Sequence, residues 1–95
     1  MAFTVVAHYR CEPADADAVR SALLRAREGT RTEPANLVYE VHTVVDRPGE
    51  FLLYERYADQ YGFEAHKVAD HFREIIVETV WPLLTERSVT FAELL

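Results

Sequence analysis

Two histidines five residues apart are the side chains of this sequence best suited to chemistry. His66 and His71 lie in the stretch FEAHKVADHF, which begins at Phe63 and ends at Phe72. A neutral imidazole takes up or releases a proton near cellular pH, so either side chain could act as a general base. The aromatic surroundings favour His66, whereas His71 could equally point outward at the start of a helix.

A metal site is the weaker interpretation of the same pair. Metal ligands on a helix usually lie three or four residues apart, because that spacing puts both on one face. A spacing of five turns the second side chain away, unless the helix breaks between them. The sequence has one cysteine and neither a CxxC nor an HExxH motif, so further ligands would have to come from separate strands. We therefore predict no metal site.

Glu55 is the best partner for a catalytic histidine. It lies within the run FLLYERY (51–57), where a strand would place it on one face with Phe51, Leu53 and Tyr57. Burial of a carboxylate is costly unless the group is paired. Glu55 is therefore either a functional residue or part of a structural ion pair, and the sequence leaves both alternatives open.

The other candidates are an amide and several aromatics that could bind a flat ligand. Asn36 follows a predicted loop, where its side chain could shape a turn or hold a carbonyl or hydroxyl group. An apolar cavity could be lined by Tyr39, Tyr54, Phe72 and Trp81. For any one of these aromatics, a place in the core is the commoner role.

The composition is that of one folded domain spanning residues 1–95. Hydrophobic residues make up 49% of the chain, and it has only three glycines and four prolines. Sixteen acidic and ten basic residues give a net charge of −6, which argues against binding to nucleic acid or to an anionic membrane. Cys11 is the single cysteine, and no signal peptide is recognisable. We therefore predict a soluble cytoplasmic protein.

The pattern of apolar residues predicts the element order β-α-β-β-α-β. The expected strands cover residues 3–11, 37–45, 51–57 and 87–92. The first helix opens at Pro13, and the second is split into a piece from Asp59 to about Lys67 and a piece from Phe72 to near Pro82. This order predicts a ferredoxin-like α+β fold, with a four-stranded antiparallel sheet and helices on one face. Because the second and third strands are apolar on both faces, we expect a homodimer that pairs the open faces of two sheets.

Three stretches of the chain resemble the antibiotic biosynthesis monooxygenase (ABM) family. They are EPANLVYEV (33–41), FLLYERYAD (51–59) and FEAHKVADHF (63–72). The family pattern has an acidic residue, Pro/Gly, Gly and Asn/Cys before the second strand, a glutamate in the third strand, and His-x-x-Ser/Thr-x-His-Phe/Tyr on a helix. The sequence departs from this pattern at Ala35, where glycine is usual, and at Ala69, where serine or threonine is usual.

The resemblance implies a homodimer that oxidises phenols or quinols with molecular oxygen, without a metal or an organic cofactor. On that basis His66 would accept the substrate proton, Glu55 would support it, and Asn36 would anchor the substrate. The residues expected to line the substrate pocket are Tyr39, Tyr54, His71, Phe72 and Trp81.

Other branches of the same family offer alternatives. One isomerises the phosphorylated signal autoinducer-2, and its runs NLRF and FHKTTPHY are close to NLVY and EAHKVADH here. A phosphate would require cations in the pocket, for which the candidates are Arg56, Lys67 and Arg73. Haem-degrading members carry an asparagine in the first strand and a tryptophan before the haem-ligating histidine, whereas this strand has no asparagine and Trp81 follows both histidines. A ligand-binding dimer without catalytic activity is the third alternative.

Overall fold

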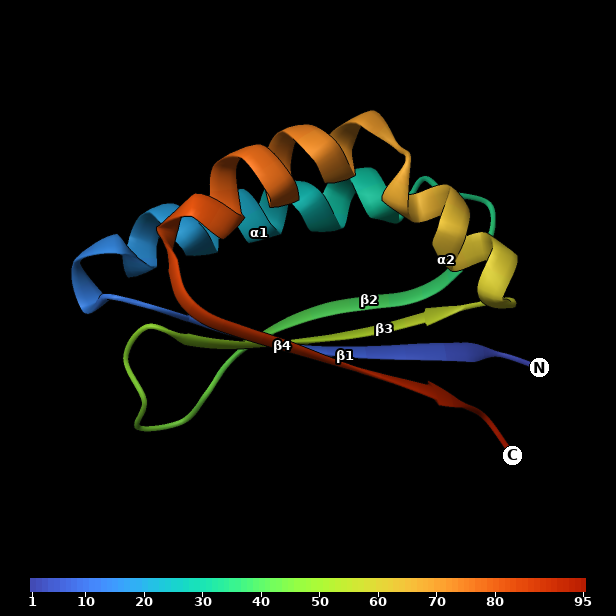
Figure 1. The fold of residues 1–95 in the computed structure, drawn as a ribbon, viewed down its shortest axis with the longest axis horizontal. Coiled ribbons are helices and arrows are strands. Elements are labelled where there is room, and N and C mark those ends of the chain that lie inside the picture. The colour runs from blue at the N-terminus through green and yellow to red at the C-terminus, as the bar shows by residue number, and fades with distance from the viewer.

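The computed structural model describes residues 1–95 and contains the four strands and the helices expected from the sequence (Figure 1). The elements in chain order are β1 (Phe3–Cys11), η1 (Pro13–Asp15), α1 (Ala16–Thr30), β2 (Asn36–Thr43), β3 (Glu50–Tyr57), α2 (Gln60–Lys67), η2 (Phe72–Val80), η3 (Trp81–Leu83) and β4 (Leu84–Glu93). None of the helices is both long and apolar enough to cross a membrane.

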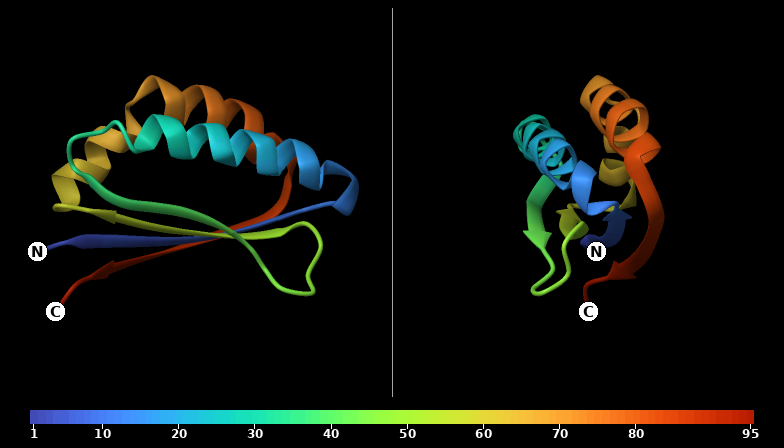
Figure 2. Two further views of the ribbon diagram at one scale, coloured as in Figure 1. Left: turned by 180° about the vertical axis from the view of Figure 1, so that it is seen from behind. Right: turned by 90° about the vertical axis from the view of Figure 1, so that its left-hand side faces the viewer.

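The four strands form one antiparallel sheet in the order β2-β3-β1-β4. Helices α1 and η2 pack side by side over one face of this sheet and leave the other face open (Figure 2). The architecture confirms the predicted ferredoxin-like fold. It also places the start of η2 close to the loop that follows α1, and these are the segments that build the site.

Two predicted strand boundaries were wrong. Strand β2 ends at Thr43, because Val44 and Val45 belong to a turn in which Asp46 (φ 61°) and Gly49 (φ 82°) adopt left-handed conformations. Such conformations interrupt the ladder and let the chain reverse direction. Strand β4 begins at Leu84, three residues before the predicted start, because pairing with β1 continues past a bulge to Cys11.

The core lies between the covered face of the sheet and the two long helices. Helix α1 buries Val19, Ala22, Leu23 and Ala26, which are the residues whose i, i+3, i+4, i+7 spacing predicts a single apolar stripe. These side chains pack with the inward-facing residues of β1 and β3 and with Ile76 and Val80 of η2. Burial of this stripe fixes the helices over the sheet and so sets the positions of their ends.

A break in the second helix determines where the two histidines point. Helix α2 starts after Asp59, whose carboxylate accepts a hydrogen bond from the Gly62 N–H at 2.9 Å. The helix ends at Lys67, and the chain turns at Val68 before helical structure resumes. His66 therefore lies at the end of one helical piece and His71 at the start of the next, so the five-residue spacing does not separate their side chains.

Candidate active site

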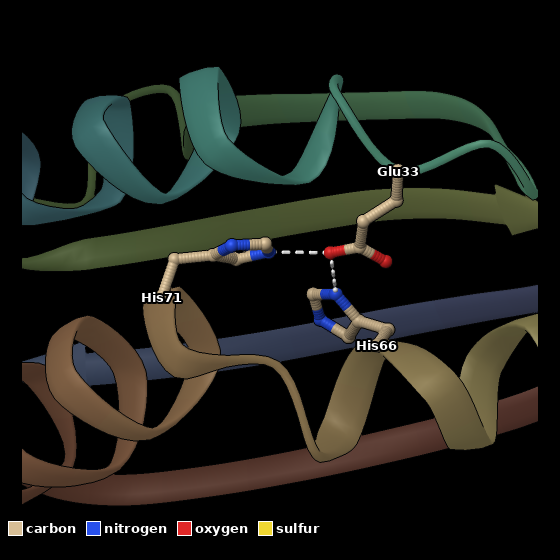
Figure 3. Close-up of side chains that lie close together, drawn as sticks. All are labelled: Glu33, His66 and His71. Atoms are coloured by element: carbon tan, nitrogen blue, oxygen red, sulfur yellow. Dashed lines mark hydrogen bonds and ion pairs between the residues drawn. The ribbon is translucent and has the colours of Figure 1, made fainter.

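Both histidines converge on one carboxylate oxygen of Glu33, a residue that we did not select from the sequence (Figure 3). Nδ1 of His66 lies 2.9 Å from Oε2 of Glu33, and Nε2 of His71 hydrogen bonds to the same oxygen. Glu33 lies in the loop between α1 and β2. Backbone hydrogen bonds from its own N–H to Thr30 and from the Asn36 N–H to its carbonyl hold this loop in place. The site thus combines a loop with both pieces of a broken helix.

The contact with Glu33 determines which nitrogen of His66 is free. An ionised carboxylate can only accept hydrogen bonds, so His66 donates from Nδ1–H and carries its lone pair on Nε2. The His66 side chain is only 2% exposed. This burial lowers the pKa of its imidazolium, although the Glu33 carboxylate acts in the opposite direction. His66 is therefore a neutral base whose free nitrogen points away from Glu33.

The free nitrogen of His66 faces a second carboxyl group. Its Nε2 lies 3.8 Å from Oε1 of Glu55, which is also buried. Burial raises the pKa of Glu55 to about 7, although the Tyr57 hydroxyl donates a 2.7 Å hydrogen bond that favours the ionised form. Glu55 therefore exchanges protons in the neutral pH range, which makes it suited to pass a proton to or from His66.

A cavity of about 380 Å³ adjoins these two groups, between β1 and β4 on one side and α2 and η2 on the other. Most of its wall is apolar and is formed by Val5, Ala7, Phe63, Phe72, Trp81 and Phe91. Two cationic side chains, Lys67 and Arg87, also line it. A hollow of about 700 Å³ lies at the other end of the sheet, but it is open and lined mainly by polar and charged residues, so it does not provide an enclosed site.

The structure brings four of the predicted site residues to this cavity: Glu55, His66, Phe72 and Trp81. The Phe72 ring packs edge-on against His66 and against Trp81, with centroid distances of 5.0 Å and 6.0 Å. His71 does not line the cavity. It is connected to His66 through the shared oxygen of Glu33, and its side chain is 24% exposed.

The other three predicted residues lie away from the cavity. The side-chain amide of Asn36 donates to the Val38 carbonyl at 3.0 Å and stabilises the irregular start of β2. Tyr39 is 1% exposed and packs in the core, with its ring centroid 6.1 Å from that of His66. Tyr54 lies on the open face of the sheet, where its hydroxyl accepts a 2.7 Å hydrogen bond from Arg56.

Sequence reasoning also missed several residues of the site. Arg87 places its guanidinium 3.6 Å from the centroid of the Trp81 ring, so a cation covers one face of that tryptophan. Tyr9 accepts a hydrogen bond from the Trp81 indole N–H at 3.4 Å. The sequence did indicate that Glu33 could belong to the site, because the family pattern has an acidic residue at that position. No comparable signal identifies Tyr9 or Arg87, which reach the site only through strand pairing.

Comparison with known proteins identifies the family of this chain. The sequence profile described as antibiotic biosynthesis monooxygenase matches residues 2–78. The chain belongs to this family. No curated protein matches the sequence.

Solved structures with the same fold cover almost the whole of this ABM-family chain. Rv0793 from Mycobacterium tuberculosis is 26% identical and superposes with a TM-score of 0.91, over 100% of this chain and 96% of its own. A Nitrosomonas europaea protein, provisionally assigned as an antibiotic biosynthesis monooxygenase, is 23% identical with a TM-score of 0.94, over 99% and 90% of the two chains. PA3566 from Pseudomonas aeruginosa is 22% identical with a TM-score of 0.91, over 99% and 94%. The fold is thus that of ABM-type monooxygenases.

Proposed function

We propose that this protein is a cofactor-independent monooxygenase that oxidises a phenolic or quinol-type aromatic substrate with molecular oxygen. The observation that carries the proposal is the neutral, buried His66, whose Nε2 lone pair lies beside an apolar cavity while Glu33 holds Nδ1. A base in an apolar cavity can create an electron-rich anion without water around it.

The proposed oxidation requires few protein groups other than the base His66. His66 takes a proton from the substrate, and the resulting carbanion or phenolate reacts with oxygen directly. With an anthrone-type substrate, the reacting CH₂ group becomes C=O. The carbon loses two hydrogens and gains one oxygen atom, and the second oxygen atom leaves with those hydrogens as water. The substrate supplies all the electrons, so the reaction needs no separate reductant.

The residues around His66 have distinct roles in this proposal. Glu33 keeps the proton on Nδ1 and stabilises the imidazolium that forms when Nε2 takes up the substrate proton, as the carboxylate of a catalytic triad does. Glu55, at 3.8 Å from Nε2, provides a second place for that proton. Phe72 and Trp81 form a flat apolar wall for the aromatic rings of the substrate.

A homodimer is also part of the proposal. Val6, Leu52 and Tyr54 lie on the uncovered face of the sheet, where they are only half-buried within one chain. Apolar side chains on an open sheet face are stabilised when a second sheet covers them. We propose that two copies pair these faces, which leaves the cavities on the outer, helix-covered sides.

An isomerase acting on a small phosphorylated signal of the autoinducer-2 type is a second candidate. The observation that favours it is the presence of Lys67 and Arg87 at the cavity, because a phosphate group is bound best by cationic donors. Inorganic phosphate is a simple probe of this alternative. Saturable binding of phosphate that is lost in Arg87→Gln would favour the isomerase over the oxygenase.

The experiment that tests the oxygenase is oxygen uptake by metal-stripped protein, in the presence of a chelator, with a panel of quinols and anthrones. We expect uptake that survives chelation and is lost in His66→Ala. His42→Ala is the matched control, because His42 is an exposed histidine of β2 on the opposite side of the sheet. Uptake that is equal in the wild type and in His66→Ala would contradict the assignment of the base.

A further inference from the structure

We propose that Glu33, His66 and His71 form a binding site for a divalent transition metal ion, with Zn²⁺ as the best-fitting ion. The ligand atoms of these three residues all lie within 4.8 Å of one another. Two imidazole nitrogens and one carboxylate oxygen are a common ligand set for zinc, which binds them at about 2.0–2.2 Å and keeps a fourth position for water. The break after α2 is what makes this set geometrically available.

The ligand atoms of the three side chains lie close enough together for an ion to bind between them. Both imidazoles direct a nitrogen at the same oxygen of Glu33, and Figure 3 shows the two rings approaching it from different sides. A tetrahedral zinc site separates its ligand atoms by about 3.3 Å, so movements of roughly 1 Å by these side chains would admit the ion.

The charge around the site also favours a cation. The only ion-pair partners of Glu33 and Glu55 are the two histidines, and no lysine or arginine lies within 4.0 Å of either carboxylate. Two partly or fully buried acidic groups therefore lack a permanent positive charge nearby. A divalent ion would supply that charge where lysine and arginine do not.

Groups beyond the three ligands are arranged to orient them. Metal-bound histidines usually donate their other ring N–H to a carboxylate or carbonyl group. Glu55 lies 3.8 Å from the second nitrogen of His66 and can take this role. The ring of His71 packs against Gly29 of α1, where an added Cβ would lie 2.9 Å from its Cγ. With 24% of the His71 side chain exposed, an ion can reach the site from solvent.

Metal binding would change the protonation of His66. An ion on Nδ1 displaces the proton from that nitrogen, and the neutral ring then carries its proton on Nε2, next to Glu55. The lone pair that faces the cavity is lost. If the proposed oxygenase function holds, Zn²⁺ is therefore an inhibitor of this protein, and the same histidine cannot serve as ligand and base at once.

The test is a titration of tag-free, metal-stripped protein with Zn²⁺ by calorimetry and with Co²⁺ by visible absorption. We expect one site per chain, with the intense visible bands of tetrahedral Co²⁺. Both His71→Ala and Glu33→Gln should weaken binding at least 100-fold, whereas Glu55→Gln should weaken it roughly 10- to 100-fold as the loss of an outer partner. The exposed histidine variant His42→Ala should bind like the wild type.

Two results would contradict the proposed metal site. One is the absence of saturable binding below millimolar Zn²⁺, and the other is binding that His71→Ala and Glu33→Gln leave unchanged, which would indicate surface histidines. Circular dichroism of the metal-free variants shows whether each is folded. If His71→Ala does not fold, Glu33→Gln still tests the site, because glutamine retains the size of the glutamate side chain. These readouts involve no substrate, so a failure of the proposed oxygenase function does not affect them.

Discussion

Two glutamates of β3 show how the two faces of one sheet create opposite electrostatic environments. Glu50 lies on the open face, where His8 donates to its carboxylate at 3.0 Å and Arg10 lies at 3.2 Å. These partners lower the pKa of Glu50. Glu55, five residues further along, faces the helices, and burial there raises its pKa to about 7.

The difference comes from the partners that each face supplies. The hydrogen bond from His8 favours the ionised form of Glu50 most strongly, and Arg10, which is always charged, adds to this effect. Glu55 has only a tyrosine hydroxyl and a neutral histidine beside it, so neither of its protonation states is strongly preferred at neutral pH. A carboxyl group of this second kind is suited to proton transfer.

The largest effect on the rate of oxygen uptake is expected for the histidine beside Glu55, and almost none for the histidine beside Glu50. We expect His66→Ala to lower the rate of oxygen uptake by roughly 10²- to 10⁴-fold, which is the usual contribution of a general base. His8→Ala, which removes the histidine beside Glu50, should leave the rate within about twofold of wild type. Steady-state rates of both variants with the same substrate test this prediction. An equal loss of rate in the two variants would show that the two faces of the sheet do not differ in function.

The stability of glutamine variants should change in opposite directions on the two faces. In the folded protein Glu55 binds its proton up to about pH 7, instead of 4.5, so stability falls as the pH rises between these values. Glu55→Gln avoids this loss and should be more stable than wild type by up to about 3 kcal/mol at pH 8, with little difference at pH 4.

Glu50→Gln should be destabilised at pH 7 and nearly unaffected at pH 3, because a lowered pKa contributes stability that disappears as the carboxylate is protonated. Urea unfolding of both variants at three pH values provides the measurement. A loss of stability in Glu55→Gln at pH 8 would show that the protein accommodates ionised Glu55 well. The two glutamates would then have the same effect on stability.

A smaller effect is expected when the partner of His66 is changed and the base itself is kept. Glu33→Gln replaces the anion with a neutral amide, which can accept or donate a hydrogen bond. The proton of neutral His66 is then no longer held on Nδ1. We expect kcat to fall roughly 10- to 100-fold with KM nearly constant, since the amide does not stabilise the imidazolium. Nitrogen NMR of the imidazoles should show Nδ1 of His66 protonated in the wild type and a mixture of tautomers in Glu33→Gln. An unchanged tautomer would contradict this role of Glu33.

The smallest effect is expected at a residue that contacts neither glutamate. Gly29→Ala adds a Cβ 2.9 Å from Cγ of His71, which has to shift. The gain in helix propensity of about 1 kcal/mol offsets only part of the strain, because the new Cβ would also lie 3.0 Å from Cβ of His71, so the melting temperature should fall slightly. The affinity for Zn²⁺ should nevertheless fall several-fold, because His71 is displaced. Ser21→Ala, at an exposed position of the same helix, is the control and should bind Zn²⁺ as the wild type does.

Local patterns in the sequence were sufficient to predict the fold. The apolar stripe of α1 and the alternation in β1 and β3 each lie within a few residues, and the predicted element order agrees with the structure. The ends of β2 and β4 were predicted less well. They depend on a turn with left-handed residues and on pairing across a bulge, and neither leaves a clear pattern in the strand itself.

The site was only partly predictable, because its members meet through tertiary contacts. His66 and Glu55 were predicted from residue type, neighbours and the family resemblance, and both lie at the cavity. Tyr54 was assigned to the pocket although its position in the alternation of β3 puts it on the other face from Glu55. Glu33 lies 33 residues before His66 and 38 before His71, so no local spacing connects them.

The sequence by itself determined the order of elements, the buried stripe of α1 and the chemical nature of the candidate base, because these depend on residue types and short-range periodicity. Only the tertiary structure decided that Glu33 joins the two histidines, which nitrogen of His66 is free, and that Glu50 and Glu55 differ in pKa. These properties arise from distances and burial between segments far apart in the chain. They are fixed when the helices pack against the sheet and exclude water from one of its faces.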